Sequence, residues 1–203
     1  HARETGARIQ IHLSETQTEH EECKQRHGLT PAAYMEAHGI FDSPTTAAHC
    51  VWLEDEDFDI LKRHGVPVAC CPASNLKLAS GYANVPKMLE SGINVALGTD
   101  GAASNNNLNI MQDMYLFGVV YKGYFRDPTI ITPAEVLHAA TRAGALSQGR
   151  DDSGLLAVGM RADLCVLNTD TPQFTPMTSA ACNVVYAAQG ADIRMTMVDG
   201  EVL

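Results

Sequence analysis

The sequence predicts an α/β fold, with a parallel βα array over residues 1–150 and part of a small β domain over residues 151–203. Short apolar runs alternate with helical patterns in the first segment, which is typical of strands connected by helices. Short strand patterns and turns replace the helices in the second segment. The chain of 203 residues, 45% hydrophobic and 19% charged, is long and apolar enough for a sizeable core.

Four apolar runs are predicted to be the strands of the array. They are RIQIHL, TTAAHC, VPVACC and INVALG, at residues 8–13, 45–50, 66–71 and 93–98. Helices are expected from Glu19 to about His38, over 54–65, around Val85–Ser91, from Leu108 to about Tyr124 and from Thr132 to Gly149. Thr30-Pro31 and Thr132-Pro133 each place a capping hydroxyl before a proline, which favours a helix start.

After residue 150 the patterns indicate short strands and turns. They are predicted within GLLAVGMRADLCVLN, NVVYAAQG and IRMTMVDGEVL, at residues 154–168, 183–190 and 193–203. Asp199-Gly200 stands between two strand patterns, and this dipeptide is a strong signal for a tight hairpin.

Charge and hydropathy favour a small-molecule partner. The net charge is -10 and the 14 Lys and Arg residues do not cluster, so neither a nucleic acid nor an anionic membrane is an expected partner. No apolar stretch approaches about 20 residues and no leader is visible, which argues against a transmembrane helix or a signal peptide. The six cysteines have no CxxC spacing, so free thiols and a cytoplasmic location are expected.

Polar residues follow the predicted strands at one edge of the array. His12 and Glu15 lie in IHLSE, His49 in AAHC and Asp100 in LGTDG. The carboxyl ends of parallel strands lie on one face, so these four can converge, provided that Glu15 lies in the loop beyond its strand. Each residue alone also has a structural explanation, such as an Asx turn at Asp100.

Imidazole and carboxylate ligands suit zinc or ferrous iron, and a catalytic zinc needs about three protein ligands and an open position. His12 and Asp100 could be two of them, while a nearby glutamate can carry a proton and a nearby histidine can polarise the group attacked. The other histidines, among them His20, are expected to be solvated. Cys70-Cys71 is expected to pack rather than act as a nucleophile, and Asn105–Asn107 is expected to be a loop that caps the next helix and could contact a ligand.

A set of motifs along nearly the whole chain resembles the amidohydrolase superfamily. The motifs are HLSE (12–15), AAHC (47–50), CPASNLKLASG (71–81), LGTDGAASNN (97–106), TPAEVLHAAT (132–141) and GMRADLCVL (159–167). The subgroup most similar to them acts on S-adenosylhomocysteine and 5′-methylthioadenosine as adenosine-type deaminases, and triazine chlorohydrolases are close relatives.

This resemblance implies a (β/α)8 TIM barrel with a composite β-sandwich domain, and one divalent metal, zinc or iron. The metal is held by two histidines of an HxH on the first strand, a histidine on the fifth and an aspartate on the eighth. His12 matches the fifth-strand ligand and Asp100 the eighth-strand ligand. Glu15 matches the proton shuttle, His49 the histidine that orients the attacking hydroxide, and Ser104 a position that lines the substrate pocket, where Glu15 also contacts the substrate.

The chain departs from the family pattern because it contains no HxH and has only 11 residues before His12. Residues 1–150 are therefore expected to be strands 5–8 of the barrel, in the C-terminal half of a longer enzyme. The segment alone is expected to be a poor catalyst. Its exposed strand edges favour pairing with the missing N-terminal half or with another copy in a homo-oligomer.

The predicted function is metal-dependent hydrolytic deamination of S-adenosylhomocysteine or 5′-methylthioadenosine by the intact protein, with release of ammonia. One alternative is another amidohydrolase, such as a triazine chlorohydrolase or guanine deaminase, because loops select the substrate. The other is a non-catalytic, doubly wound α/β binding domain in which His12 and Asp100 are structural.

Overall fold

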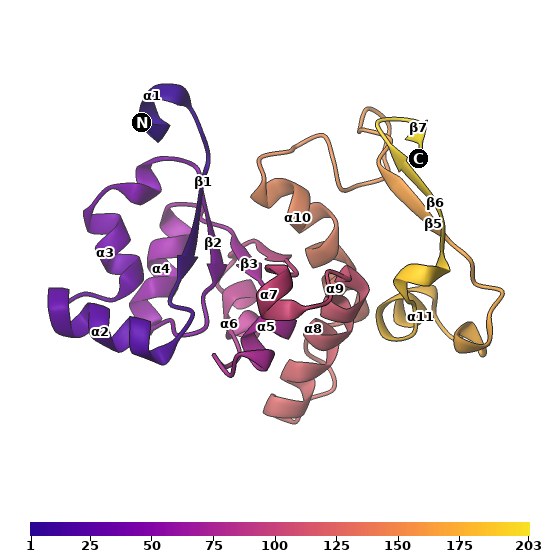
Figure 1. The fold of residues 1–203 in the computed structure, drawn as a ribbon, viewed down its shortest axis with the longest axis horizontal. Helices are drawn as coiled ribbons and strands as arrows, with labels where there is room; N and C mark the ends of the chain where they lie inside the picture. Colours follow the sequence, from indigo (N-terminus) through magenta and orange to yellow (C-terminus); the bar gives the residue numbers. More distant parts are fainter.

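The computed structural model describes residues 1–203 and contains two separate sheets (Figure 1). The first is a four-stranded parallel sheet in the order β1-β2-β3-β4. Its strands are β1 (Ile9–Leu13), β2 (Thr45–His49), β3 (Val68–Cys70) and β4 (Val95–Leu97). They confirm the four predicted strands of the array.

The order of the strands identifies the architecture. Each strand lies beside the next one in sequence, and the order never reverses. A doubly wound sheet reverses at a switch point, so the doubly wound architecture of the alternative is wrong, whereas a barrel sheet continues in one direction. The chain has the architecture of part of a TIM barrel, as predicted.

Helices connect and follow the parallel strands. Those in the connections are α2 (Gln17–His27), α3 (Pro31–Ala37), α4 (Asp55–Arg63), α5 (Pro72–Lys77) and α6 (Val85–Glu90). Those after β4 are α7 (Ala102–Asn105), α8 (Ile110–Phe125), α9 (Pro133–Ala140) and α10 (Arg142–Ser147), and α1 (Ala2–Thr5) precedes β1. Three short 3₁₀ helices complete the helical elements. Ile40–Asp42 lies before β2, and Pro172–Phe174 and Gly190–Asp192 follow α10 in the sequence.

Two of the predicted helices are each divided in two. The helix expected from Glu19 to His38 breaks because Gly28 has a left-handed φ of 69° that ends α2, and Thr30 then caps α3. The helix expected from Thr132 to Gly149 breaks at Thr141, whose φ of -124° and ψ of -87° are not helical. Thr132 caps α9 as predicted, with its hydroxyl accepting from the Glu135 amide.

The core lies between the parallel sheet and its helices. Leu13, Val68 and Val95 from the strands are fully buried with Leu61, Met88 and Phe117 from the helices. Fully burying one such side chain contributes roughly 1.5–3 kcal/mol, so this apolar layer is what fixes the strand ends in register. None of the helices combines the length and hydropathy needed to cross a membrane.

The second sheet is antiparallel and contains β5 (Leu164–Leu167), β6 (Ile193–Val198) and β7 (Glu201–Val202). It lies at the opposite end of the molecule from α2 and α3 (Figure 1). The hairpin predicted at Asp199-Gly200 is confirmed. Both residues have positive φ, 52° and 85°, as a type I′ turn requires.

One expected strand is wrong, because residues within NVVYAAQG belong to a helix, α11 (Ala180–Tyr186). The Ser179 hydroxyl caps it by accepting from the Cys182 amide, and α11 packs on α8 and α9 with Val185 fully buried. This packing outweighs the strand propensity of its two valines. The division into domains at residue 150 stays a prediction.

Candidate active site

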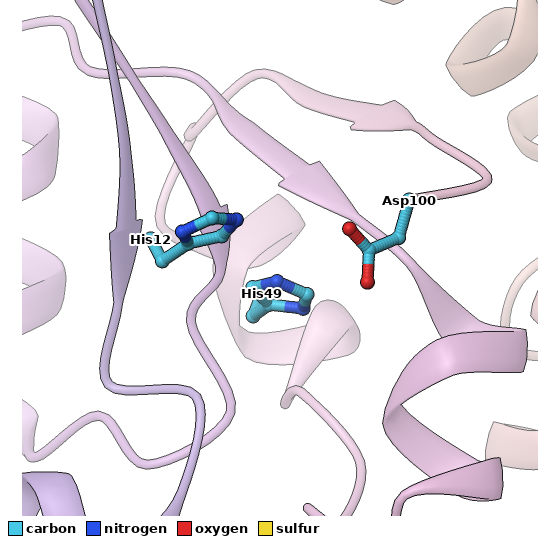
Figure 2. A group of neighbouring side chains, drawn as sticks. All are labelled: His12, His49 and Asp100. Carbon is cyan, nitrogen blue, oxygen red and sulfur yellow. The ribbon is translucent and has the colours of Figure 1, made fainter. Parts of the chain in front are cut away.

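Three predicted site residues meet at the carboxyl edge of the parallel sheet. His12 lies in β1, His49 is the last residue of β2, and Asp100 follows β4 in a loop. One possible ligand atom from each lies within 4.8 Å of the others. Figure 2 shows the two imidazoles and the carboxylate facing one another. The register of β1 and β2 pairs His12 with Ala48 and Leu13 with His49, so the two histidines lie one position apart on neighbouring strands.

His49 is the buried member of this group, with a side chain that is 1% exposed. Its ring stacks on His12 with 5.3 Å between the ring centroids. Its Nδ1 lies 2.8 Å from Asn75 Oδ1, and its Nε2 lies 3.7 Å from Glu15 Oε2. The backbone has a left-handed φ of 70°, which is uncommon for a residue with a side chain and is typical of functional sites.

Glu15 lies two residues beyond the end of β1, in the loop position that its contribution to the site requires. Ser14, with a φ of 48°, turns the chain at this point. The amides of Ser14 and Glu15 donate to the Glu19 carboxylate at 2.8 and 2.7 Å, so the first turn of α2 fixes the loop. The Glu15 Oε1 atom accepts from Ser80 Oγ at 3.5 Å.

Asp100 accepts hydrogen bonds from two serines, Ser74 at 2.6 Å and Ser104 at 2.5 Å. Partial burial raises the pKa of Asp100, but the hydrogen bonds from Ser104 and Ser74 outweigh it and hold the pKa below its usual value. The carboxylate is therefore ionised at neutral pH. Ser104 was predicted to line the substrate pocket, and its hydroxyl donates a hydrogen bond to the Asp100 carboxylate.

His20 was expected to be solvated, but it is buried and supports the loop that carries Glu15. Its side chain is 5% exposed, its Nε2 lies 3.1 Å from Glu54 Oε1, and its Nδ1 lies 3.5 Å from Ser14 Oγ. The ring is buried because His20 stands at the fourth position of α2, which faces back onto the loop before the helix. The Thr16-x-x-Glu19 pattern ahead of it was the signal that could have indicated this.

The expectations for the cysteine pair and the asparagine run have different outcomes. Cys70 and Cys71 are both buried, as predicted. Burial raises the pKa of the Cys70 thiol to about 12, so this thiol is protonated at neutral pH. Asn105–Asn107 does not cap α8, whose cap is Asn109. Asn105 instead lies in α7 and donates to the Thr99 carbonyl at 2.7 Å, which holds the loop that carries Asp100.

Three buried polar residues of the CPASNLKLASG motif also reach the site. Ser74, Asn75 and Ser80 contact Asp100, His49 and Glu15 respectively. No strand-end pattern indicates them, because they lie in the short helix α5 and the turn after it. The motif itself was the only signal in the sequence.

The grouped side chains fit a divalent metal. Two imidazoles and an ionised carboxylate are a donor set that zinc accepts, and their ligand atoms are already close enough to share one ion. His12 is exposed, so the shared space is open to solvent. A bound ion would supply Lewis acidity and lower the pKa of water.

A parallel barrel sheet with histidines and an aspartate at its carboxyl edge defines a class of barrel hydrolases, whose sites lie at this edge. The model of the Amidohydrolase family matches residues 1–203. The chain belongs to the amidohydrolase family, as its motifs indicated.

Two curated relatives are adenosine-type deaminases by name. The chain is 44% identical over 195 residues to a 5'-deoxyadenosine deaminase of Methanothermobacter thermautotrophicus, covering 96% of this chain and 45% of the relative. It is 44% identical over 198 residues to a 5-methylthioadenosine/S-adenosylhomocysteine deaminase of Pelotomaculum thermopropionicum, covering 98% and 46%. The chain spans about half the length of the curated relatives that it matches.

Solved structures with the same fold contain zinc. An adenosine deaminase from Xanthomonas campestris with bound zinc matches with a TM-score of 0.95 and 30% identity, over 99% of this chain and 46% of that one. An atrazine chlorohydrolase from Arthrobacter aurescens, complexed with zinc, matches with a TM-score of 0.91 and 28% identity, over 100% and 45%.

Proposed function

We propose that the intact protein that contains this chain hydrolytically deaminates an adenosine-type nucleoside, S-adenosylhomocysteine or 5′-methylthioadenosine. The observation that carries this proposal is the meeting of His12, His49 and Asp100 beside Glu15 at the carboxyl edge of the sheet. The names of the relatives support deamination as the reaction.

His12 and Asp100 are the residues that would hold one divalent metal, with zinc favoured by the two zinc-containing structures and iron as the alternative. Asp100 suits this role because its lowered pKa keeps it ionised. When bound, the metal supplies Lewis acidity and makes water a better nucleophile at neutral pH.

The remaining groups move protons. Glu15 takes one proton from the attacking water and delivers it to the ring nitrogen beside the amino-bearing carbon, while His49 orients that water through Nε2. The water oxygen bonds to this carbon and the carbon–nitrogen bond breaks. The second water proton passes through Asp100 to the leaving amine. The products are ammonia and the inosine analogue, so all atoms of the water are accounted for.

The test is a substrate panel on the purified intact protein loaded with zinc. The conversion of adenine to hypoxanthine absorbance is followed with S-adenosylhomocysteine, 5′-methylthioadenosine and 5′-deoxyadenosine. Turnover of at least one of the first two is expected. Atrazine and guanine complete the panel, and turnover of either one without any nucleoside would replace the deaminase proposal by the other amidohydrolase function.

The non-catalytic alternative predicts a different result. A binding domain would contain no metal, and Asp100→Ala would change neither metal content nor activity. The intact protein is instead expected to contain about one ion per chain. The N-terminal half of the barrel as a partner, the homo-oligomer and the cytoplasmic location stay predictions.

A further inference from the structure

Residues 74–80 contact three residues of the candidate site, Asp100, His49 and Glu15, and each contact comes from a different buried side chain. Ser74 Oγ donates to Asp100 Oδ2 at 2.6 Å. Asn75 Oδ1 lies 2.8 Å from His49 Nδ1. Ser80 Oγ donates to Glu15 Oε1 at 3.5 Å. The three contacted residues come from different strands or loops, so they share this one segment as their support.

We propose that residues 74–80 form a positioning segment, whose three buried polar side chains each fix one residue of the candidate site. This inference rests on the proposed function, since it assigns its residues to the support of the same chemistry. Ser74, Asn75 and Ser80 are positioning residues rather than catalytic ones, because they act through Asp100, His49 and Glu15.

The segment is held rigidly from two sides. The Ala73 amide at the start of α5 donates to Asp113 of α8 at 3.0 Å. The Trp52 indole donates to the Ser80 carbonyl at 2.8 Å, which ties the end of the segment to the loop after β2. The Asn75 carbonyl closes the turn by accepting from the Ser80 amide at 2.9 Å. A support that orients other side chains must itself be ordered in this way.

The close approach of the two loops requires glycine at residue 81. Gly81 has a φ of 121°, and a Cβ there would lie 3.0 Å from the Val51 side chain. A residue with a side chain at this position would adopt a strained backbone conformation and would crowd Val51.

Asn75 has the most specific role, because its contact selects the tautomer of His49. A carbonyl oxygen can only accept, so in the neutral imidazole of His49 the proton lies on Nδ1 and Nε2 presents its lone pair. Nε2 faces Glu15, and His49 is grouped with His12 and Asp100. A lone pair on this side is what an imidazole needs to bind a cation or to accept a hydrogen bond from water.

The Nδ2 atom of Asn75 has no hydrogen-bond partner although the residue is 1% exposed. An unpaired buried amide is costly, about 1–3 kcal/mol. The Asn75 side chain therefore makes its hydrogen bond through Oδ1, to His49, and this contact is what the buried amide contributes to the site.

The experiment uses three variants of the positioning segment in the intact protein: Asn75→Leu, Asn75→Asp and Ser80→Ala. Ser43→Ala is the matched control for Ser80→Ala. Ser43 and Ser80 are both 6% exposed, but Ser43 lies at the opposite, amino end of β2. The readouts are the ¹⁵N signals of the His49 ring in metal-free protein, the zinc dissociation constant, and kcat and KM separately.

Asn75→Leu is expected to give His49 a mixture of tautomers and to lower kcat about 10–100-fold, with KM and zinc affinity nearly unchanged. Asn75→Asp keeps the acceptor and is expected to restore the Nδ1–H tautomer. Ser80→Ala is expected to lower kcat but not zinc affinity, and Ser43→Ala to change neither.

An unchanged His49 tautomer in Asn75→Leu would overturn the inference. If Asn75→Leu does not fold, Ser80→Ala decides, and a kcat equal to that of Ser43→Ala overturns the inference. The ring ¹⁵N signals do not depend on turnover. A protein that deaminates no nucleoside but shows the tautomer change therefore refutes the proposed function and leaves the positioning role of Asn75 supported.

Discussion

Asp100 and Glu15 are two carboxylates in one site whose surroundings suit different roles. Asp100 belongs to the group of close ligand atoms, whereas the Glu15 carboxylate contacts His49 and Ser80. Asp100→Asn keeps the shape of the side chain and removes its charge. Loss of a residue that only hydrogen-bonds to a metal ligand weakens metal binding about 10–100-fold. Because Asp100 is itself a proposed ligand, Asp100→Asn is expected to weaken zinc binding by the intact protein by more than this. Equilibrium dialysis measures this loss, and exposed Asp59 in α4 provides the control, Asp59→Asn.

Glu15→Gln is expected to show the opposite pattern, because Glu15 is proposed to transfer protons and not to bind the metal. The kcat for the nucleoside should fall about 10²–10⁴-fold, the usual contribution of a general acid or base. Zinc content should stay at its original level. Metal analysis and steady-state kinetics on the same sample check both parts, with exposed Glu21→Gln as control. Loss of zinc from Glu15→Gln would contradict this division of roles.

At the scale of elements, an ion pair ties α3 to the end of α4. The Arg63 guanidinium donates to Glu36 through Nε at 2.8 Å and Nη2 at 2.7 Å, and His64 Nε2 lies 2.7 Å from the same carboxylate. The hydrogen bond from Arg63 is the main cause that lowers the pKa of Glu36. A depressed carboxyl pKa stabilises the fold above the unfolded pKa, and this contribution is lost as pH falls through the folded pKa.

Glu36→Gln should therefore lower the free energy of unfolding at pH 7 by about 0.2–1 kcal/mol, the range for a solvent-exposed pair. The difference should begin to shrink as pH falls below the usual glutamate pKa of about 4.3, and it should disappear below the lowered pKa of Glu36 in the folded protein. Urea unfolding of both proteins at several pH values measures it. A difference that persisted unchanged in acid would show that Glu36 acts through packing.

The elements that the sequence predicted are those with strong local signals. Strand ends at His49 and near Asp100 follow apolar runs, and α8 has sixteen residues of helical pattern. The six-residue helix α5 is too short for periodicity to reveal it, although it carries Ser74 and Asn75. α11 was missed because its packing on α8 and α9 is a tertiary effect. The convergence of site residues followed from parallel topology, whereas their supporting contacts depend on loop geometry that no pattern encodes.

At the scale of the whole molecule, the four-stranded sheet has two unpaired edges. β1 pairs only with β2, and β4 only with β3. Ile9 and Ile11 of β1 are half-buried rather than covered, although strands inside a barrel are buried on both faces. Unpaired edges of this kind recruit other strands. The chain matches about half of each curated relative, which is consistent with further strands completing the barrel.

A polypeptide of residues 1–203 alone is therefore expected to self-associate and to bind zinc more weakly than the intact protein. Light scattering after size exclusion measures the first property, and zinc titration the second. Addition of a polypeptide that carries the matching remainder of the intact protein should disperse the self-associated species and strengthen zinc binding, because it would cover β1 and β4 and supply further ligands. A monodisperse monomer with the zinc affinity of the intact protein would show that the four strands are self-sufficient and that His12, His49 and Asp100 complete the site unaided.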